Sequence, residues 1–126
     1  MAIKSIQLEK LIRDQLPKIM ESQGTRLQTR ILVDDEFVQM LKEKLLEEAK
    51  EVHLAKNFDE LTEELADVLE VIHALSKASG VFMQAIENKR IEKRHAKGGF
   101  DAGIFVERVE MEESNPAIRF FNKNDS

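Results

Sequence analysis

The sequence predicts an all-α fold: a helical bundle built on an antiparallel helix hairpin, with room for one short β-hairpin. Apolar residues recur at helical spacing through residues 34–56, a segment without glycine or proline, and again through residues 59–79. The connection between the two segments, Lys56 to Asp59, is short and polar. So short a connection returns the second helix antiparallel to the first.

Length and composition predict one globular domain. The chain has 126 residues, of which 42% are hydrophobic and 34% are charged. It is too apolar for a disordered chain and too charged for a membrane protein, and its longest aliphatic run (31–33) cannot span a bilayer. We therefore expect a single domain over residues 1–111, a polar tail over residues 112–126 and no membrane partner.

Charge and cysteine content narrow the function classes. Cysteine is absent, which excludes disulfides, thiolate metal ligands and cysteine nucleophiles. The formal net charge of -5 argues against a nucleic-acid partner. No apolar leader follows the first four residues, so we expect no secretory signal, and the cytoplasm is the expected compartment.

Shorter elements flank the expected hairpin. A short helix over about residues 15–23 would have Asp14 as its N-cap, Pro17 in its first turn and Gly24 just after its end. Residues 27–33 and residues 104–111 have a strand-like pattern. Each segment is too short to be stable alone, so the two would pair with each other.

The ends of the longer helices also carry sequence signals. Asp34 or Asp35 is expected to cap the first long helix, and Asp59 the second, which Gly80 closes. The inward face of the second long helix is expected to contain Leu61, Leu65, Val68, Leu69, Ile72 and Leu75. A last helix over residues 82–97 begins apolar and ends basic.

The carboxylates of the two long helices fall in unusual places. At about 100° per residue, Glu48 lies inside the apolar stripe of its helix, with Glu51 at the stripe's edge and Glu47 farther out. On the next helix Glu64 lies inside the apolar arc, and Asp67 flanks it. Heights also match, since Glu51 and Glu64 lie about 7 Å from the turn, and Glu48 and Asp67 about 11 Å.

The repulsion between clustered carboxylates must be offset. Two like charges about 5 Å apart repel by roughly 3 kcal/mol even at an effective dielectric constant near 20. Either some acids are protonated or cations neutralise them, and an all-oxygen ligand set favours Mg²⁺ or Mn²⁺. The competing interpretation is that these glutamates are ordinary solvated side chains.

The basic helix offers a counterpart to the acids. The face begun by the apolar residues is continued by Lys89, Arg90, Lys93 and Lys97, and Arg94 lies slightly to one side. These cations would clamp phosphate oxygens. The alternative is a solvated helix end whose positive charges favour the C-terminal dipole.

Four short motifs in order resemble the all-α nucleotide pyrophosphohydrolases, the MazG-like and phosphoribosyl-ATP pyrophosphohydrolase-like group. Glu47 to Glu51 reads E-E-x-x-E, and after twelve residues Glu64 to Asp67 reads E-x-x-D. The segments KLIRDQLP, starting at Lys10, and KRHAKGGF, starting at Lys93, resemble the same group. The similarity spans about residues 8–106.

The resemblance implies Mg²⁺-dependent cleavage between the α and β phosphates of a nucleoside triphosphate. By motif match, the metal ligands would be Glu48, Glu51, Glu64 and Asp67. Glu47 would orient or deprotonate the attacking water, although spacing leaves open which acid, Glu47 or Glu48 among them, is the base. Lys89, Lys93 and Arg94 would face the phosphates. Members of this group assemble as homodimers or homotetramers, so a homo-oligomer is expected.

Other functions compete with this interpretation. Hydrolysis of phosphoribosyl-ATP in histidine synthesis would use the same residues. A ferritin-like di-iron protein would need Glu-x-x-His motifs pointing into a bundle, and Glu70 to His73 has that spacing once. A non-catalytic interaction module would pair its acidic hairpin with the basic helix of a neighbour.

Overall fold

The structure, a computed structural model, describes residues 2–121, and all regular structure within that range is helical. The predicted all-α class is therefore confirmed. In chain order the elements are α1 (Leu16–Ser22), α2 (Asp34–Leu54), α3 (Phe58–Ser79), α4 (Met83–Lys97) and α5 (Ile118–Phe121). Of the helices in this range, none combines the length and the apolar character that crossing a membrane requires.

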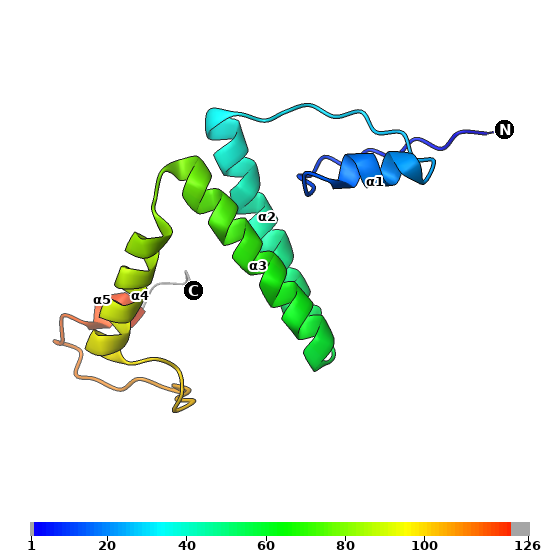
Figure 1. Cartoon of the computed structure of the whole chain (residues 1–126). Coiled ribbons are helices and arrows are strands. Elements are labelled where there is room, and N and C mark those ends of the chain that lie inside the picture. The colour runs from blue at the N-terminus through cyan, green and yellow to red at the C-terminus, as the bar shows by residue number, and fades with distance from the viewer. Residues whose placement is uncertain (1, 122–126) are drawn as a thin grey trace. The chain divides into compact units, whose positions relative to one another are not determined.

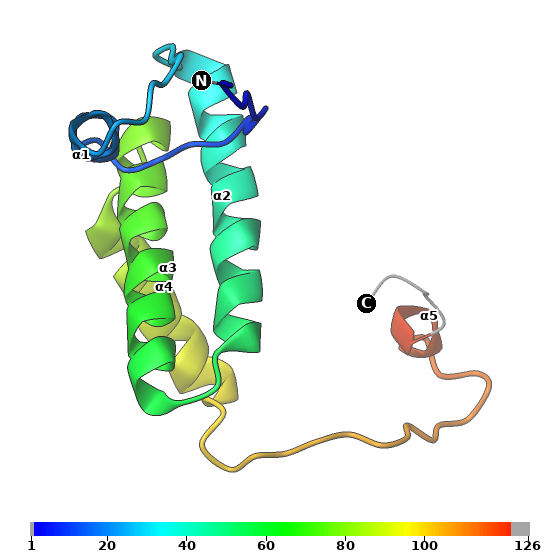
Figure 2. The same cartoon turned by 90° about the vertical axis from the view of Figure 1, so that its right-hand side faces the viewer.

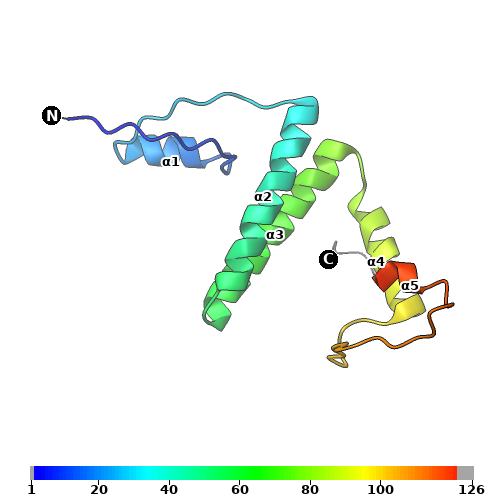
Figure 3. The same cartoon turned by 180° about the vertical axis from the view of Figure 1, so that it is seen from behind.

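The helices α2 and α3 form the predicted antiparallel hairpin (Figure 1). They lie side by side in the views of Figure 2 and Figure 3. Asn57 caps α3, because its extended backbone brings its side-chain oxygen within 2.9 Å of the Glu60 amide nitrogen. The Glu60 carboxylate in turn accepts from the Lys56 amide at 2.8 Å. The prediction of Asp59 as N-cap was wrong, since Asp59 already lies within the first turn.

The other helix ends follow simple backbone rules. Gly80 closes α3 as predicted, in a left-handed conformation with φ of 78°, and its amide donates to the Ser76 carbonyl. The α2 N-cap is Val33, without a side-chain bond, and not Asp34 or Asp35. Those two acids lie within the first turn of α2, where negative charge favours the helix dipole.

The most buried apolar side chains in residues 2–121 lie on α2 and α3, which contact each other. Leu41 on α2 and Val71 on α3 are the most buried apolar side chains there, with exposed fractions of 5% and 8%. Ser76 is also buried, and its hydroxyl donates to the Val81 carbonyl. Leu65 and Leu69, expected to point inward, are instead exposed. Their side of α3 therefore has no cover from α2.

The predicted strands do not form. Residues 27–33 and residues 104–111 are irregular, and no strand occurs in the part of the chain that the structure describes. A short segment with alternating apolar residues forms a strand only when it pairs with a neighbouring strand. Neither segment has such a pairing in the described residues. Residues 27–33 are instead tied to α2, since Arg30 donates to both Glu36 carboxylate oxygens, at 2.7 and 3.0 Å.

The N-terminal helix α1 begins differently from the prediction. Its N-cap is Gln15, not Asp14, and no side chain caps it. Pro17 lies in the first turn as expected, where the missing N–H costs no helical hydrogen bond. The chain then turns at Gly24, whose φ is 91°.

The chain divides into two compact units, one up to Lys89 and one from Arg90 onwards. In the second unit, the Gly98 amide donates to the Arg94 carbonyl at 2.8 Å with φ of 86°, which ends α4. The boundary at residue 111 between a domain and a polar tail stays a prediction. The helix α5 belongs to the expected tail, of which residues 122–126 lie outside the described range.

Removing the side chain of Leu41 tests the hairpin packing. We expect Leu41→Ala to lower the free energy of unfolding by about 2–5 kcal/mol, because it leaves a cavity in the α2–α3 contact. The matched control is Ile31→Ala, at an 87% exposed position, with an expected change below about 0.5 kcal/mol. Urea denaturation measures both, and equal effects would contradict the assigned core.

Candidate metal centre

Three carboxylates converge across the hairpin. Each of Glu48 on α2 and Glu64 and Asp67 on α3 offers an oxygen, and these oxygens lie within 4.8 Å of one another. All three residues are half-buried. Glu64 and Asp67 are spaced i,i+3, which puts both on one side of α3, and the α2–α3 contact brings Glu48 opposite them.

The other two predicted acids lie around this triad. Glu51, predicted as a fourth ligand, is exposed and does not belong to the group of converging oxygens. It is still close enough to raise the pKa of Glu64 by its charge. Glu47 is half-buried and accepts from Lys10 at 2.9 Å and from Lys44 at 3.4 Å.

The electrostatic environment divides the acids into two kinds. Burial raises the pKa of Glu64 above its usual range, and the charges of Asp67, Glu51 and Glu48 raise it further. The hydrogen bond from Lys10 lowers the pKa of Glu47 below its usual range, against an opposing effect of burial. The ionised form of Glu64 is therefore disfavoured, whereas Glu47 is stabilised as a carboxylate.

Basic side chains from two parts of the chain meet the acids. Arg13, in the irregular segment before α1, donates from Nη2 to Asp67 Oδ1 at 2.6 Å. Lys44 on α2 lies 3.5 Å from Glu48 Oε1. Our sequence reasoning did not place Lys10, Arg13 or Lys44 in the site. The only signal was the KLIRDQLP segment, which contains the first two but does not show where they lie.

The arrangement is suited to a hard divalent cation. Every potential ligand is a carboxylate oxygen, the donor type that Mg²⁺ and Mn²⁺ prefer. The carboxylates of this region outnumber the basic side chains that contact them. A divalent ion would reduce this excess of negative charge and relieve the repulsion on Glu64.

The predicted phosphate-binding cations all lie on α4. Lys89, Lys93 and Arg94 are exposed, and Arg94 donates from Nη2 to Asp101 Oδ2 at 2.8 Å. Lys89 belongs to the first compact unit, and Lys93 and Arg94 belong to the second. Their role towards phosphate stays a prediction.

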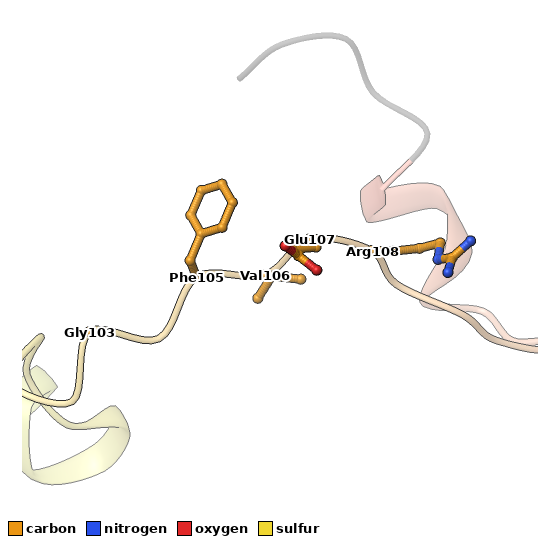
Figure 4. A pocket seen from close by; sticks show the side chains of 5 residues that line it. All are labelled: Gly103, Phe105, Val106, Glu107 and Arg108. Carbon is orange, nitrogen blue, oxygen red and sulfur yellow. The ribbon is translucent and has the colours of Figure 1, made fainter.

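The second unit has a shallow hollow along an extended stretch of chain (Figure 4). It is lined by Gly103, Phe105, Val106, Glu107 and Arg108, all exposed. One carboxylate and one guanidinium among apolar groups offer neither a metal-ligand set nor a nucleophile with a base. This hollow therefore has no catalytic arrangement of its own.

The di-iron alternative has no support from the geometry. Glu70 and His73 are both exposed on α3, whereas Val71 between them is buried. A Glu-x-x-His motif of a di-iron bundle must point inward. The converging acids in the described range therefore offer oxygen ligands alone.

Comparison with protein families identifies the family of the chain. A family model described as phosphoribosyl-ATP pyrophosphohydrolase matches residues 7–95, well over half of the chain. The matched range contains α1, α2 and α3, together with all five acids and the three basic side chains that contact them. Comparisons with curated proteins and with solved structures gave no significant match. The chain therefore belongs to the phosphoribosyl-ATP pyrophosphohydrolase family.

Proposed function

We propose that this protein is a Mg²⁺-dependent nucleoside triphosphate pyrophosphohydrolase, which cleaves between the α and β phosphates and releases a nucleoside monophosphate and pyrophosphate. The supporting observation is the triad of Glu48, Glu64 and Asp67 across the hairpin of a chain in a pyrophosphohydrolase family. Hydrolysis of phosphoribosyl-ATP is the second candidate, because the family's description names that substrate.

The triad would hold the metal through carboxylate oxygens. Glu51 would not bind the metal directly but would add negative charge beside it, since it is exposed next to the other acids. A bound Mg²⁺ or Mn²⁺ would neutralise phosphate charge and acidify water at the site. The protein's part is to hold these oxygens in place before the nucleotide arrives, which the α2–α3 packing does.

Two glutamates of α2 are candidates for handling the attacking water. Glu47 has a lowered pKa and two lysine partners, so it is a weak proton acceptor and a good hydrogen-bond acceptor. We therefore assign Glu47 to orienting the water. Glu48 shares the triad with the metal ligands and lies 3.5 Å from Lys44. Glu48 would therefore bind the metal and also act on the attacking water.

The cations of α4 complete the proposal. Lys89, Lys93 and Arg94 would contact phosphate oxygens, because ammonium and guanidinium groups bind phosphate through charge-assisted hydrogen bonds. Arg94 would exchange Asp101 for the phosphate, and both partners in that ion pair are well exposed. An exposed ion pair contributes little to stability, so its exchange costs little.

A homodimer or homotetramer is the second part of the proposal. In residues 2–121 Leu41 and Val71 are the only apolar side chains that are buried. Leu65 and Leu69 on α3 are 46% and 56% exposed, and Leu46 on α2 is more exposed still. A further copy of the chain would cover these side chains and enlarge the core.

Replacing Asp67 tests the activity and the metal site together. A panel of canonical and modified nucleoside triphosphates and phosphoribosyl-ATP would be assayed with Mg²⁺ for pyrophosphate release. We expect Asp67→Asn to lower the rate by about 100-fold or more, because a positioned charge is lost from the site. The control Asp59→Asn makes the same change at an exposed position in the first turn of α3. An active, metal-dependent Asp67→Asn protein would contradict the ligand assignment, and no release from any substrate would favour a non-catalytic interaction module.

Glu64→Gln separates fold stability from metal binding. Because the folded-state pKa of Glu64 is raised, its ionised form destabilises the fold at neutral pH, and this penalty disappears as the pH falls through that pKa. We expect Glu64→Gln to raise the metal-free Tm at neutral pH. It should also reduce the Tm increase that Mg²⁺ causes in the wild-type protein, since fewer ligands remain. Thermal denaturation measures both effects, with Glu70→Gln as an exposed control on α3. A lower metal-free Tm would show that Glu64 is not under electrostatic strain.

Charge placed on the exposed face of α3 tests the oligomer. We expect Leu69→Glu to convert the oligomer to monomers, because an ionised side chain would have to be desolvated in the contact. Sedimentation velocity measures the change. Ile31→Glu introduces the same charge at an exposed position outside the helices and should leave the assembly intact. A monomeric wild-type chain would refute the oligomer.

A further inference from the structure

The irregular segment before α1 places two cations on the acids of the hairpin. Lys10 Nζ lies 2.9 Å from Glu47 Oε1 on α2, and Arg13 Nη2 lies 2.6 Å from Asp67 Oδ1 on α3. The two residues are separated by three positions in the chain, yet each contacts a different helix. The segment passes across both helices (Figure 2).

These two cations meet the acids on which the proposed function depends. Asp67 belongs to the converging triad, and Glu47 directly precedes Glu48 of that triad. Lys10 and Arg13 therefore supply positive charge to the same group of acids that would bind a divalent ion. Both are well exposed, at 44% and 59% of their side chains, so neither is locked in place by packing.

Negative charge in this region requires positive partners both before and after the nucleotide binds. Its carboxylates outnumber their basic partners, and a divalent ion would offset part of that excess. A nucleoside triphosphate then brings several more negative charges, which again require positive partners. Lys44 is less available for this purpose, since only 20% of its side chain is exposed and it contacts both Glu47 and Glu48.

We propose that Lys10 and Arg13 exchange partners during the catalytic cycle: they hold Glu47 and Asp67 in the metal-free protein, and they bind phosphate oxygens of the nucleotide when a divalent cation occupies the triad. The inference rests on the proposed function and extends its substrate-binding residues to the N-terminal segment. The guanidinium of Arg13 can donate two parallel hydrogen bonds to a phosphate group, and the Lys10 ammonium acts as a point charge.

The exchange is physically easy. Both ion pairs are exposed, and exposed ion pairs add little to stability because solvent screens them and long side chains lose entropy in forming them. Irregular backbone around residues 10 and 13 leaves the side chains free of helix constraints. A divalent ion on the Asp67 carboxylate would also weaken the attraction of that carboxylate for Arg13.

The test uses the full-length protein and two binding measurements by calorimetry. The first is Mg²⁺ or Mn²⁺ binding without nucleotide. The second is binding of a triphosphate analogue with a non-cleavable methylene between the α and β phosphates, at saturating Mg²⁺. We expect Arg13→Ala to bind the metal about two- to tenfold more tightly, because a competing positive charge is removed. The same variant should bind the analogue at least about tenfold more weakly, because a charged hydrogen bond to phosphate is lost.

The opposite changes expected in metal affinity and analogue affinity distinguish this proposal from two alternatives. If both affinities fall, the segment is a structural tether of the hairpin. If metal binding tightens while analogue binding is unchanged, the cations are counter-ions alone. Either result overturns the exchange. Lys10→Ala provides an independent variant with the same expected signs, should Arg13→Ala fail to fold by circular dichroism.

Two controls complete the design. Arg13→Lys keeps the positive charge, so metal affinity should return to the wild-type value while analogue binding recovers only in part. Lys18→Ala removes an exposed lysine of α1 that has no ion pair with the described residues, and it should change neither affinity. If the wild-type protein binds no metal and no analogue, the proposed function itself fails, and that result is separate from the variants' signs.

Discussion

The apolar contact between α2 and α3 holds three carboxylate oxygens within 4.8 Å of one another, and the rest of the site depends on it. Burial raises the pKa of Glu64, and the like charges of the neighbouring acids raise it further. Packing around Leu41 and Val71 therefore works against the electrostatics of the same two helices. The hairpin thus holds the three carboxylates together despite their repulsion.

The molecule offsets the repulsion unevenly. Lys10, Arg13 and Lys44 compensate Glu47, Asp67 and Glu48, whereas Glu64 has no ion pair with the described residues. The carboxylates of the region therefore still outnumber their basic partners. The N-terminal segment thereby becomes part of a site formed by the hairpin.

The same hairpin leaves apolar side chains exposed. Leu65 and Leu69 lie on α3, the helix that also carries Glu64 and Asp67, so one helix provides an acidic site and an exposed apolar face. The rigidity of α3 would link the two faces, and covering the leucines by a further copy would also steady the acids. Membership of a pyrophosphohydrolase family is consistent with a chemistry in which positioning and charge carry most of the catalysis.

The sequence by itself determined the helices, their antiparallel return and the placing of acids at matched heights, because helical rise and rotation per residue are regular and the connection is short. Those heights matched Glu51 with Glu64 and Glu48 with Asp67, and of these four acids Glu48, Glu64 and Asp67 converge. Only the tertiary structure showed that Glu51 stays outside the triad and that residues 27–33 and 104–111 form no strands. It alone brought Lys10 and Arg13 to acids 37 and 54 positions away, because no periodicity governs the path of an irregular segment.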